Sequence, residues 1–251
     1  MARRPDNRRG RSGASTPPPA TGWRATFESF GGFWTLGGSI AIVAIIAVMV
    51  VASNRSGSGS GEAFVARERP QTSGRVAGNP NAPVKIIEFG DYQCPFCRQF
   101  WKNTEEQVQK EFVDTGIASF EYRDLIIIGP ESRTAAEGAA CAADQGLFWQ
   151  MHDVLFLRQG QENRGVYSSA NVKKFAREAA EATPSVKFDG AAFDKCLDSG
   201  AKRSAVDQMN AEAATYKLQS TPSFVVNGQV GAGALTIEQI RQLVNAARGG
   251  R

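Results

Sequence analysis

The chain has 251 residues, 42% of them hydrophobic, which is enough to bury the core of one full domain with additional segments. Its formal net charge of +4 would suggest a nucleic-acid partner if the basic residues lay in the folded part. They do not, because residues 79–251 hold 19 basic and 21 acidic side chains and the basic excess lies nearer the N-terminus. The charge pattern therefore gives no support to nucleic-acid binding.

The first two segments predict a tail and a membrane span. Residues 1–32 are rich in Arg, Pro, Gly and Ser and are expected to form a disordered basic N-terminal tail. Residues 33–52 carry no charge and are long enough to cross a bilayer as one transmembrane helix, with Trp34 placed as an interfacial aromatic. A cleaved signal peptide is the alternative, because residues 50–53 loosely resemble a cleavage site, but the apolar stretch and its leader are both long for one.

The orientation of this predicted anchor is less clear from charge alone. The six arginines of the tail favour a cytoplasmic N-terminus, whereas close to the span Arg24 stands alone against Arg55, Arg67 and Arg69 on the other side. We favour a cytoplasmic N-terminus and an extracytoplasmic domain on the single-pass anchor, because the redox chemistry inferred below needs an oxidising compartment.

A linker, a strand and a cysteine motif follow. Residues 53–78 begin with a Gly- and Ser-rich run and are predicted to be a flexible linker before a folded domain at 79–251. Within that domain, the apolar run at 84–89 predicts a strand. The sequence Cys-Pro-Phe-Cys at 94–97 then opens a predicted helix at about 95–113.

This motif favours a redox-active cysteine pair. At a junction from strand to helix, the sulfur of Cys94 lies near helical N–H groups and the positive end of the helix dipole, which stabilise a thiolate. Cys97 follows within one turn, close enough for a disulfide, and Pro95 suits the first helical position because that residue needs no N–H.

A structural disulfide and half of a zinc site are the two alternative interpretations of the motif. Zinc would need a second ligand pair, and the other candidates, Cys141, Cys196 and His152, stand apart in the sequence. We therefore predict no metal site. If Cys94 pairs with Cys97, then Cys141 and Cys196 either pair with each other or both stay free.

The later elements complete an α/β pattern. In chain order they are a strand at 117–123 continuing into 125–128, a helical block at about 131–217, a strand at 223–226, a hairpin turn at Asn227-Gly228 and a closing helix at 237–247. This order matches a thioredoxin-type sheet interrupted by a helical insertion.

Three motifs carry a resemblance to a known family. They are the stretch from Gly78-Asn79-Pro80 through the Cys-Pro-Phe-Cys motif, the Phe-Trp-x-Met-His-Asp run at 148–153, and Ser-Thr-Pro-Ser-Phe-Val-Val-Asn-Gly at 220–228. Over about 79–251 the chain resembles the DsbA-like thioredoxin family, specifically its membrane-anchored bacterial members. The resemblance implies a thiol–disulfide oxidoreductase whose redox-active group is the Cys94–Cys97 disulfide, with no organic cofactor.

The resemblance also implies roles for individual residues. Thr221-Pro222 matches the family's cis-proline loop, which lies against the active-site sulfurs and, with Phe96, is expected to contact the substrate. The alternative interpretation of Pro222 is an ordinary turn proline. Glu88 matches an acidic residue that assists proton transfer to and from Cys97, and its alternative is an exposed glutamate on an edge strand.

One departure from the family bears on the direction of electron flow. The strongly oxidising members have a histidine between the cysteines, where this chain has Phe96, so Cys94 is expected to be less acidic and the disulfide less oxidising. Disulfide formation in client proteins with free cysteines remains the favoured function. The alternatives are a reductase or isomerase on the same fold and a non-catalytic peptide-binding module. For the favoured function, the resemblance implies reoxidation by a quinone-linked membrane protein, either DsbB-type or vitamin K epoxide reductase-like.

The remaining cysteines and the insertion motif have structural interpretations. We predict that Cys141 and Cys196 form a structural disulfide between two helices of the insertion, as in some family members, with two buried free thiols as the alternative. His152 is predicted to be structural, and the aromatic and methionine residues beside it, at 148–151, are predicted to belong to the core.

Overall fold

The computed structural model describes residues 64–69 and 71–249. Within these residues, no helix combines the length and apolar character needed to cross a membrane. The predicted tail at 1–32 and the predicted anchor at 33–52 lie outside them, as do residues 53–63 of the predicted linker.

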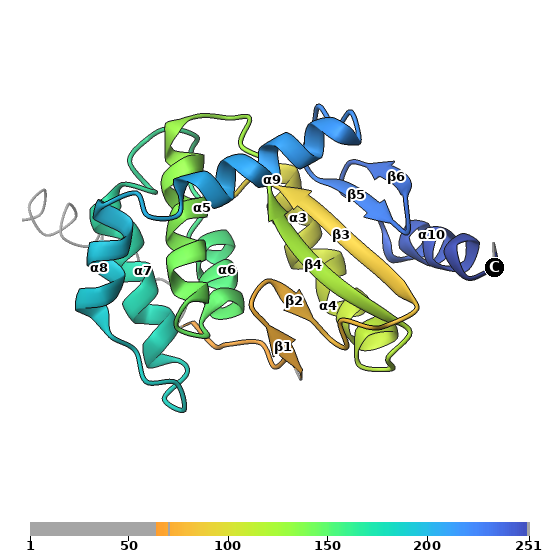
Figure 1. Ribbon diagram of the computed structural model, residues 1–251, viewed down its shortest axis with the longest axis horizontal. Coiled ribbons are helices and arrows are strands. Elements are labelled where there is room, and N and C mark those ends of the chain that lie inside the picture. The colour runs from red at the N-terminus through yellow and green to blue at the C-terminus, as the bar shows by residue number, and fades with distance from the viewer. Residues whose placement is uncertain (1–63, 70, 250–251) are drawn as a thin grey trace, which may run out of the picture. The chain divides into compact units, whose positions relative to one another are not determined.

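A single mixed sheet with the strand order β1-β2-β4-β3-β5-β6 organises the described residues (Figure 1). The strands are β1 (Thr72–Ser73), β2 (Val76–Ala77), β3 (Val84–Gly90), β4 (Ala118–Asp124), β5 (Ser223–Val226) and β6 (Gln229–Ala232). β3 and β4 run parallel, and every other neighbouring pair is antiparallel. β3 is therefore a central strand with a partner on each side.

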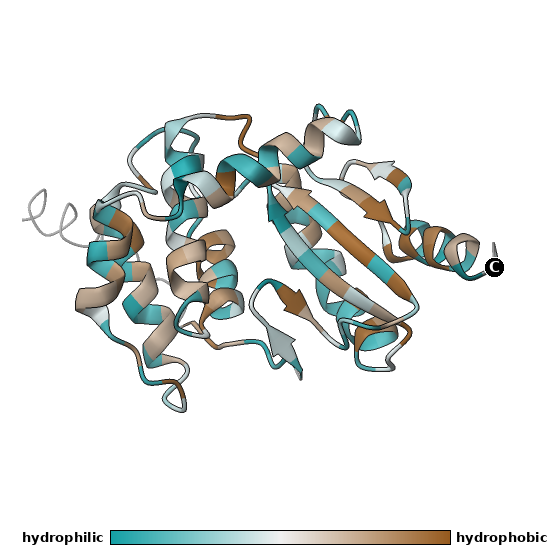
Figure 2. Ribbon diagram, in the orientation of Figure 1, coloured by the Kyte–Doolittle hydropathy of each residue, from teal (hydrophilic) through white to brown (hydrophobic). Residues whose placement is uncertain are grey.

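The alternation of side chains along β3 builds two apolar layers. Ile86 belongs to the main core, whereas Phe89 packs on the other face of the sheet with Val225 of β5. Figure 2 shows apolar residues on both β3 and β5, and all four residues of β5 are buried. Burial on both faces explains why the run at 84–90 is more continuously apolar than a half-exposed strand would be.

Helices cover the sheet and form the insertion (Figure 1). They are α3 (Pro95–Phe100), α4 (Glu106–Val108), α5 (Pro130–Ala143), α6 (Phe148–Leu157), α7 (Ser169–Glu181), α8 (Gly190–Asp198), α9 (Arg203–Thr215) and α10 (Ile237–Gly249). The predicted helix at 95–113 is present, but π-helical turns at Trp101–Glu105 and Gln109–Val113 alternate with α3 and α4. Such turns add a residue to the helical repeat and change which side chains face the core.

The predicted helical insertion at about 131–217 corresponds to α5 through α9. Helices α5 to α8 stand together beside the sheet, and α9 runs back across it (Figure 1). Ala213 of α9 completes the second apolar layer with Phe89 and Val225. The α/β fold with a helical insertion is thus confirmed.

Two predictions about the start of the domain are wrong. The flexible linker does not extend to residue 78, and the folded domain begins before residue 79. Val76 and Ala77 of β2 pair antiparallel with Glu121 and Phe120 of β4. The Gly- and Ser-rich composition that suggested a linker ends before this point, and the backbone groups of 76–77 find partners in the sheet. We call residues 64–69 and 71–77 the N-terminal strap.

The last two predictions concern the ends of strands, and the structure contradicts one and confirms the other. The prediction that the second strand continues through 125–128 is wrong, because β4 ends at Asp124. The predicted hairpin at Asn227-Gly228 is confirmed, since it joins β5 to β6 and both residues have positive φ, 45° and 90°. Such a turn needs positive φ at both positions, which Asn and Gly adopt most readily.

Candidate active site

The two motif cysteines lie where the sequence places them, at the start of α3. Cys94 is the residue before the helix and Pro95 is its first residue. Both Cys94 and Cys97 are free thiols, and Cys97 has no exposed surface. Between them, Phe96 is 61% exposed, which makes it one of the few large apolar side chains of the described residues that face solvent.

The surroundings of the two sulfurs shift their pKa values in opposite directions. Hydrogen bonding from the Cys97 side chain lowers the pKa of Cys94 to about 6 against the opposing effect of burial, and backbone N–H groups of Phe96 and Cys97 contribute. Burial raises the pKa of Cys97 well above its ordinary value, and the hydrogen bond to Cys94 adds to this. A thiolate therefore resides on Cys94 near neutral pH, and Cys97 keeps its proton.

The proline loop meets the first sulfur directly. The peptide bond between Thr221 and Pro222 is cis, and Cys94 in its protonated form donates a hydrogen bond from its thiol to the Thr221 carbonyl at 3.2 Å. Pro222 directly precedes β5, which is a neighbour of β3 in the sheet. Residues separated by 127 positions in the sequence thus contact each other at the redox centre.

Glu88 is buried in the central strand and faces α3. Its register partner on β5 is Phe224, and residues directly opposite each other share a face of the sheet. Phe224 packs against Phe100 of α3 with ring centroids 4.6 Å apart. The alternative of an exposed glutamate on an edge strand is therefore wrong, since Glu88 is 1% exposed.

The Glu88 carboxylate has no hydrogen-bond partner on either oxygen. Burial raises its pKa well above the ordinary value, and the negative charges of Glu105 and Cys94 add to the effect. In turn, Glu88 contributes to the raised pKa of Cys97. A buried carboxyl whose pKa is raised, and which lies close enough to a buried thiol to raise its pKa in turn, can exchange a proton with it.

Asp91 is a site residue that the sequence analysis missed. Its backbone N–H donates to the Cys97 sulfur at 3.5 Å, and its carboxylate accepts the N–H groups of Gln93, Ile127 and Ile128. These bonds fold the segment before Cys94 and explain why residues 127 and 128 do not continue the strand. Its position directly after β3 was the available signal, because an Asp there commonly binds nearby backbone N–H groups.

The other two cysteines form a disulfide away from the motif in sequence. Cys141 of α5 and Cys196 of α8 are joined, with their Cα atoms 6.0 Å apart. The bond ties two helices of the insertion together.

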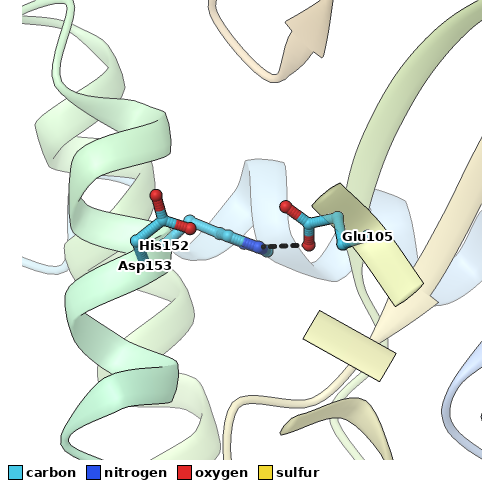
Figure 3. Close-up of side chains that lie close together, drawn as sticks. All are labelled: Glu105, His152 and Asp153. Carbon is cyan, nitrogen blue, oxygen red and sulfur yellow. Dashed lines mark hydrogen bonds and ion pairs between the residues drawn. The ribbon is translucent and has the colours of Figure 1, made fainter. Parts of the chain in front are cut away.

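The site near His152 is a buried cluster of charged side chains (Figure 3). His152 is predicted from the sequence to be structural and without a second ligand, but Glu105 and Asp153 lie beside it, with candidate ligand atoms within 4.8 Å of one another. The ring nitrogen Nε2 of His152 lies 3.1 Å from a Glu105 oxygen. The aromatic residues around it, Phe148 and Trp149, are buried as predicted.

A guanidinium from the N-terminal strap forms hydrogen bonds with the carboxylate oxygens of this cluster. Arg69 donates to both oxygens of Asp153, at 2.7 and 2.8 Å, and to Glu105 at 2.6 Å. Trp101 donates its indole N–H to Asp153 at 2.8 Å. A fixed positive charge at this position repels a metal cation, so the cluster is an ion-pair network that joins the strap to the core.

The comparisons with known proteins agree with this geometry. The family model described as "Thioredoxin" matches residues 71–246, which includes most of the N-terminal strap. The chain belongs to the thioredoxin family. Within it, the chain is similar to proteins of disulfide bond formation, in agreement with the DsbA-like resemblance.

"Disulfide bond formation protein D" of Bacillus subtilis is 26% identical over 179 residues, covering 70% of this chain and 78% of that protein. The crystal structure of oxidised BdbD from the same organism superposes with a TM-score of 0.63 at 25% identity, covering 75% of this chain and 100% of that one. A "Na(+)/H(+) antiporter NhaA 1" of Salinispora arenicola is 32% identical over 179 residues, which span 70% of this chain and 25% of that protein. The similarity to the antiporter is therefore confined to a quarter of its length.

Proposed function

We propose that this DsbA-like oxidoreductase forms disulfides in client proteins outside the cytoplasm, held to the membrane by an anchor at residues 33–52. The observation that carries the proposal is that the pKa values of the two thiols shift in opposite directions. The pKa of Cys94 is lowered to about 6, and the pKa of the buried Cys97 beside it is raised. An acidic thiol is a good leaving group, which favours passing the disulfide on to a client.

The exchange proceeds in two displacements. A client thiolate attacks the Cys94 sulfur of the Cys94–Cys97 disulfide, the S–S bond breaks, and Cys97 leaves with the electron pair and takes a proton from Glu88. A second client thiolate then attacks the client sulfur of the mixed disulfide, and Cys94 leaves as a thiolate. The client gains a disulfide and the enzyme gains two electrons, so it must be reoxidised.

The surface around Cys94 fits an extended client segment. Phe96 is exposed beside the sulfur, and the Thr221-Pro222 loop presents backbone to it at the end of β5. Reoxidation is proposed to come from a quinone-linked membrane protein of the DsbB or vitamin K epoxide reductase-like type. The Cys141–Cys196 disulfide supports an oxidising compartment, because structural disulfides persist there.

The division of labour between the cysteines can be tested by trapping. Cys97→Ser should accumulate mixed disulfides with clients, because the second thiol that would resolve them is absent, whereas Cys94→Ser should accumulate almost none. The measurement is the amount of thiol-sensitive high-mass adduct in cells expressing each variant. Equal trapping by both variants would contradict the role given to Cys94.

Phe96 favours one rival, a reductase on the same fold, because it supplies no charge to the thiolate. The reduction potential of the Cys94–Cys97 pair separates the two functions. A value near about −120 mV supports disulfide formation, and one near about −270 mV supports reduction.

A further inference from the structure

The segment that leads into Cys94 is held by side chains of the helical insertion. The Gln93 amide group donates to Ser132 at 2.9 Å and accepts the backbone N–H of Asn163 at 2.6 Å. The Tyr92 carbonyl accepts from the Tyr167 hydroxyl at 3.0 Å. The insertion thus contacts the redox centre through its loop after α6 and through α5.

Gln159 is the member of this set that contacts the backbone of Cys94 itself. It follows α6 closely, and its Nε2 donates to the Tyr92 carbonyl at 2.7 Å and to the Cys94 carbonyl at 3.0 Å. The Cys94 carbonyl also accepts the backbone N–H of Arg98 at 3.2 Å, which is the first hydrogen bond of the helix. The side chain of Gln159 therefore supplies the second hydrogen bond to the Cys94 carbonyl.

That carbonyl matters because the next residue is a proline. The peptide group between Cys94 and Pro95 has no N–H, so its only polar atom is the Cys94 oxygen. The orientation of this peptide fixes the direction of the Cys94 side chain relative to the N–H groups of Phe96 and Cys97. A donor on the Cys94 oxygen is thus the direct means by which the rest of the protein can hold that orientation.

We propose that Gln159 is a positioning residue for the Cys94 sulfur, which holds the Cys94–Pro95 peptide so that the thiolate stays within reach of the backbone N–H groups at the start of α3. The proposal rests on the proposed function, in which Cys94 is the attacked sulfur. It also makes the helical insertion part of the redox centre, because a residue of the insertion sets the stability of the thiolate.

Gln159→Met tests the proposal, since methionine has a similar length and no donor, and Gln159 is only partly buried. The Cys94 pKa, followed by thiolate absorbance of the reduced protein, should rise by roughly half a unit, the scale of one weakened hydrogen bond. The thiolate fraction below the pKa then falls about threefold. The potential of the pair should fall by roughly 15 mV, at about 29.6 mV for each tenfold change.

Tyr167→Phe is the matched control. It removes the hydroxyl that donates to the carbonyls of Tyr92 and Leu155, at 3.0 and 2.8 Å, and leaves the Cys94 carbonyl with both donors. This variant should lower the melting temperature and leave the pKa of Cys94 unchanged. Gln159→Met should do the opposite, with a small change in melting temperature and a clear shift of the pKa.

Three outcomes would overturn the inference. An unchanged Cys94 pKa in Gln159→Met, measured against a lowered pKa in the wild type, contradicts this inference alone. An equal pKa shift in both variants means general loosening of the segment rather than positioning by Gln159. An ordinary thiol pKa for Cys94 in the wild type would contradict the proposed function as well.

Discussion

Two buried glutamates in this protein behave in opposite ways. Glu88, under the redox centre, and Glu105, in the cluster of Figure 3, are 1% and 2% exposed. Burial raises the pKa of Glu88, whose oxygens have no hydrogen-bond partner. Burial acts in the same direction on Glu105, but His152 and Arg69 outweigh it and lower its pKa to about 2. Equal burial therefore does not fix the charge of a group; its partners do.

The difference fits the role proposed for each region. A carboxyl that gives and takes a proton during catalysis cannot be held by a fixed cation, because the cation would keep it ionised. A carboxyl that joins two segments of the fold needs that cation, because an unpaired buried charge is strongly destabilising. The unpaired region lies at the active site, and the paired region lies where the N-terminal strap joins the core.

Removing the cation from the paired region is expected to have the largest effect. Arg69→Met leaves Glu105 and Asp153 buried without their guanidinium and should lower the free energy of unfolding by about 3–5 kcal/mol. Urea denaturation of the two proteins measures this. Arg67→Met is the control, because Arg67 is more exposed and lies 4.0 Å from Glu105. Similar losses in the two variants would mean that Arg69 has no special role in the cluster.

The second prediction separates stability from catalysis. Cys141→Ala with Cys196→Ala removes a crosslink between residues 55 positions apart, so the free energy of unfolding should fall by up to about 4 kcal/mol. Neither residue belongs to the motif or to the proline loop, and turnover below the lowered melting temperature should be nearly unchanged. A loss of turnover at a temperature where the variant is folded would show that the Cys141–Cys196 disulfide also shapes the active site.

The third prediction concerns the replacement of the unpaired Glu88 by a neutral residue. The folded-state pKa of Glu88 is raised, so its contribution to stability is complete below the ordinary pKa of 4.5 and is lost as the pH rises toward the folded-state value. Glu88→Gln removes this loss and should stabilise the protein at pH 7 by about 1–3 kcal/mol, with the gain disappearing near pH 4. Thermal melts at the two pH values measure it.

The same variant should slow thiol–disulfide exchange, because glutamine cannot give a proton to Cys97. Wild-type exchange rates together with the expected stabilisation would exclude Glu88 as the proton donor and leave its burial unexplained. A gain in stability that is equal at pH 4 and pH 7 would show that the pKa of Glu88 is the same in the folded and the unfolded protein.

The smallest expected effect comes from adding a charge next to the unpaired region. Phe96→His should lower the pKa of Cys94 by up to about one unit, or about 1.4 kcal/mol, and make the disulfide more oxidising by a corresponding amount. Phe96→Leu keeps the apolar character and should leave both quantities unchanged. If the histidine and leucine variants shift the potential equally, the effect of residue 96 is steric rather than electrostatic.

Local patterns in the sequence determined the parts of this protein that depend on neighbouring residues. The Cys-Pro-Phe-Cys motif after an apolar run was sufficient to place Cys94 at the start of a helix, because strand, proline and helix signals are all local. Asn227-Gly228 was likewise sufficient for the hairpin, since its geometry needs positive φ at those two residues.

Only the tertiary structure decided which charged groups meet. Arg69 binds Glu105 and Asp153, which lie 36 and 84 positions further along the chain, and no period or motif links them. For that reason the strap was predicted to be a flexible linker, and Glu105 was not singled out at all. The state of a buried charge depends on all the groups around it in space, and the sequence shows only its neighbours along the chain.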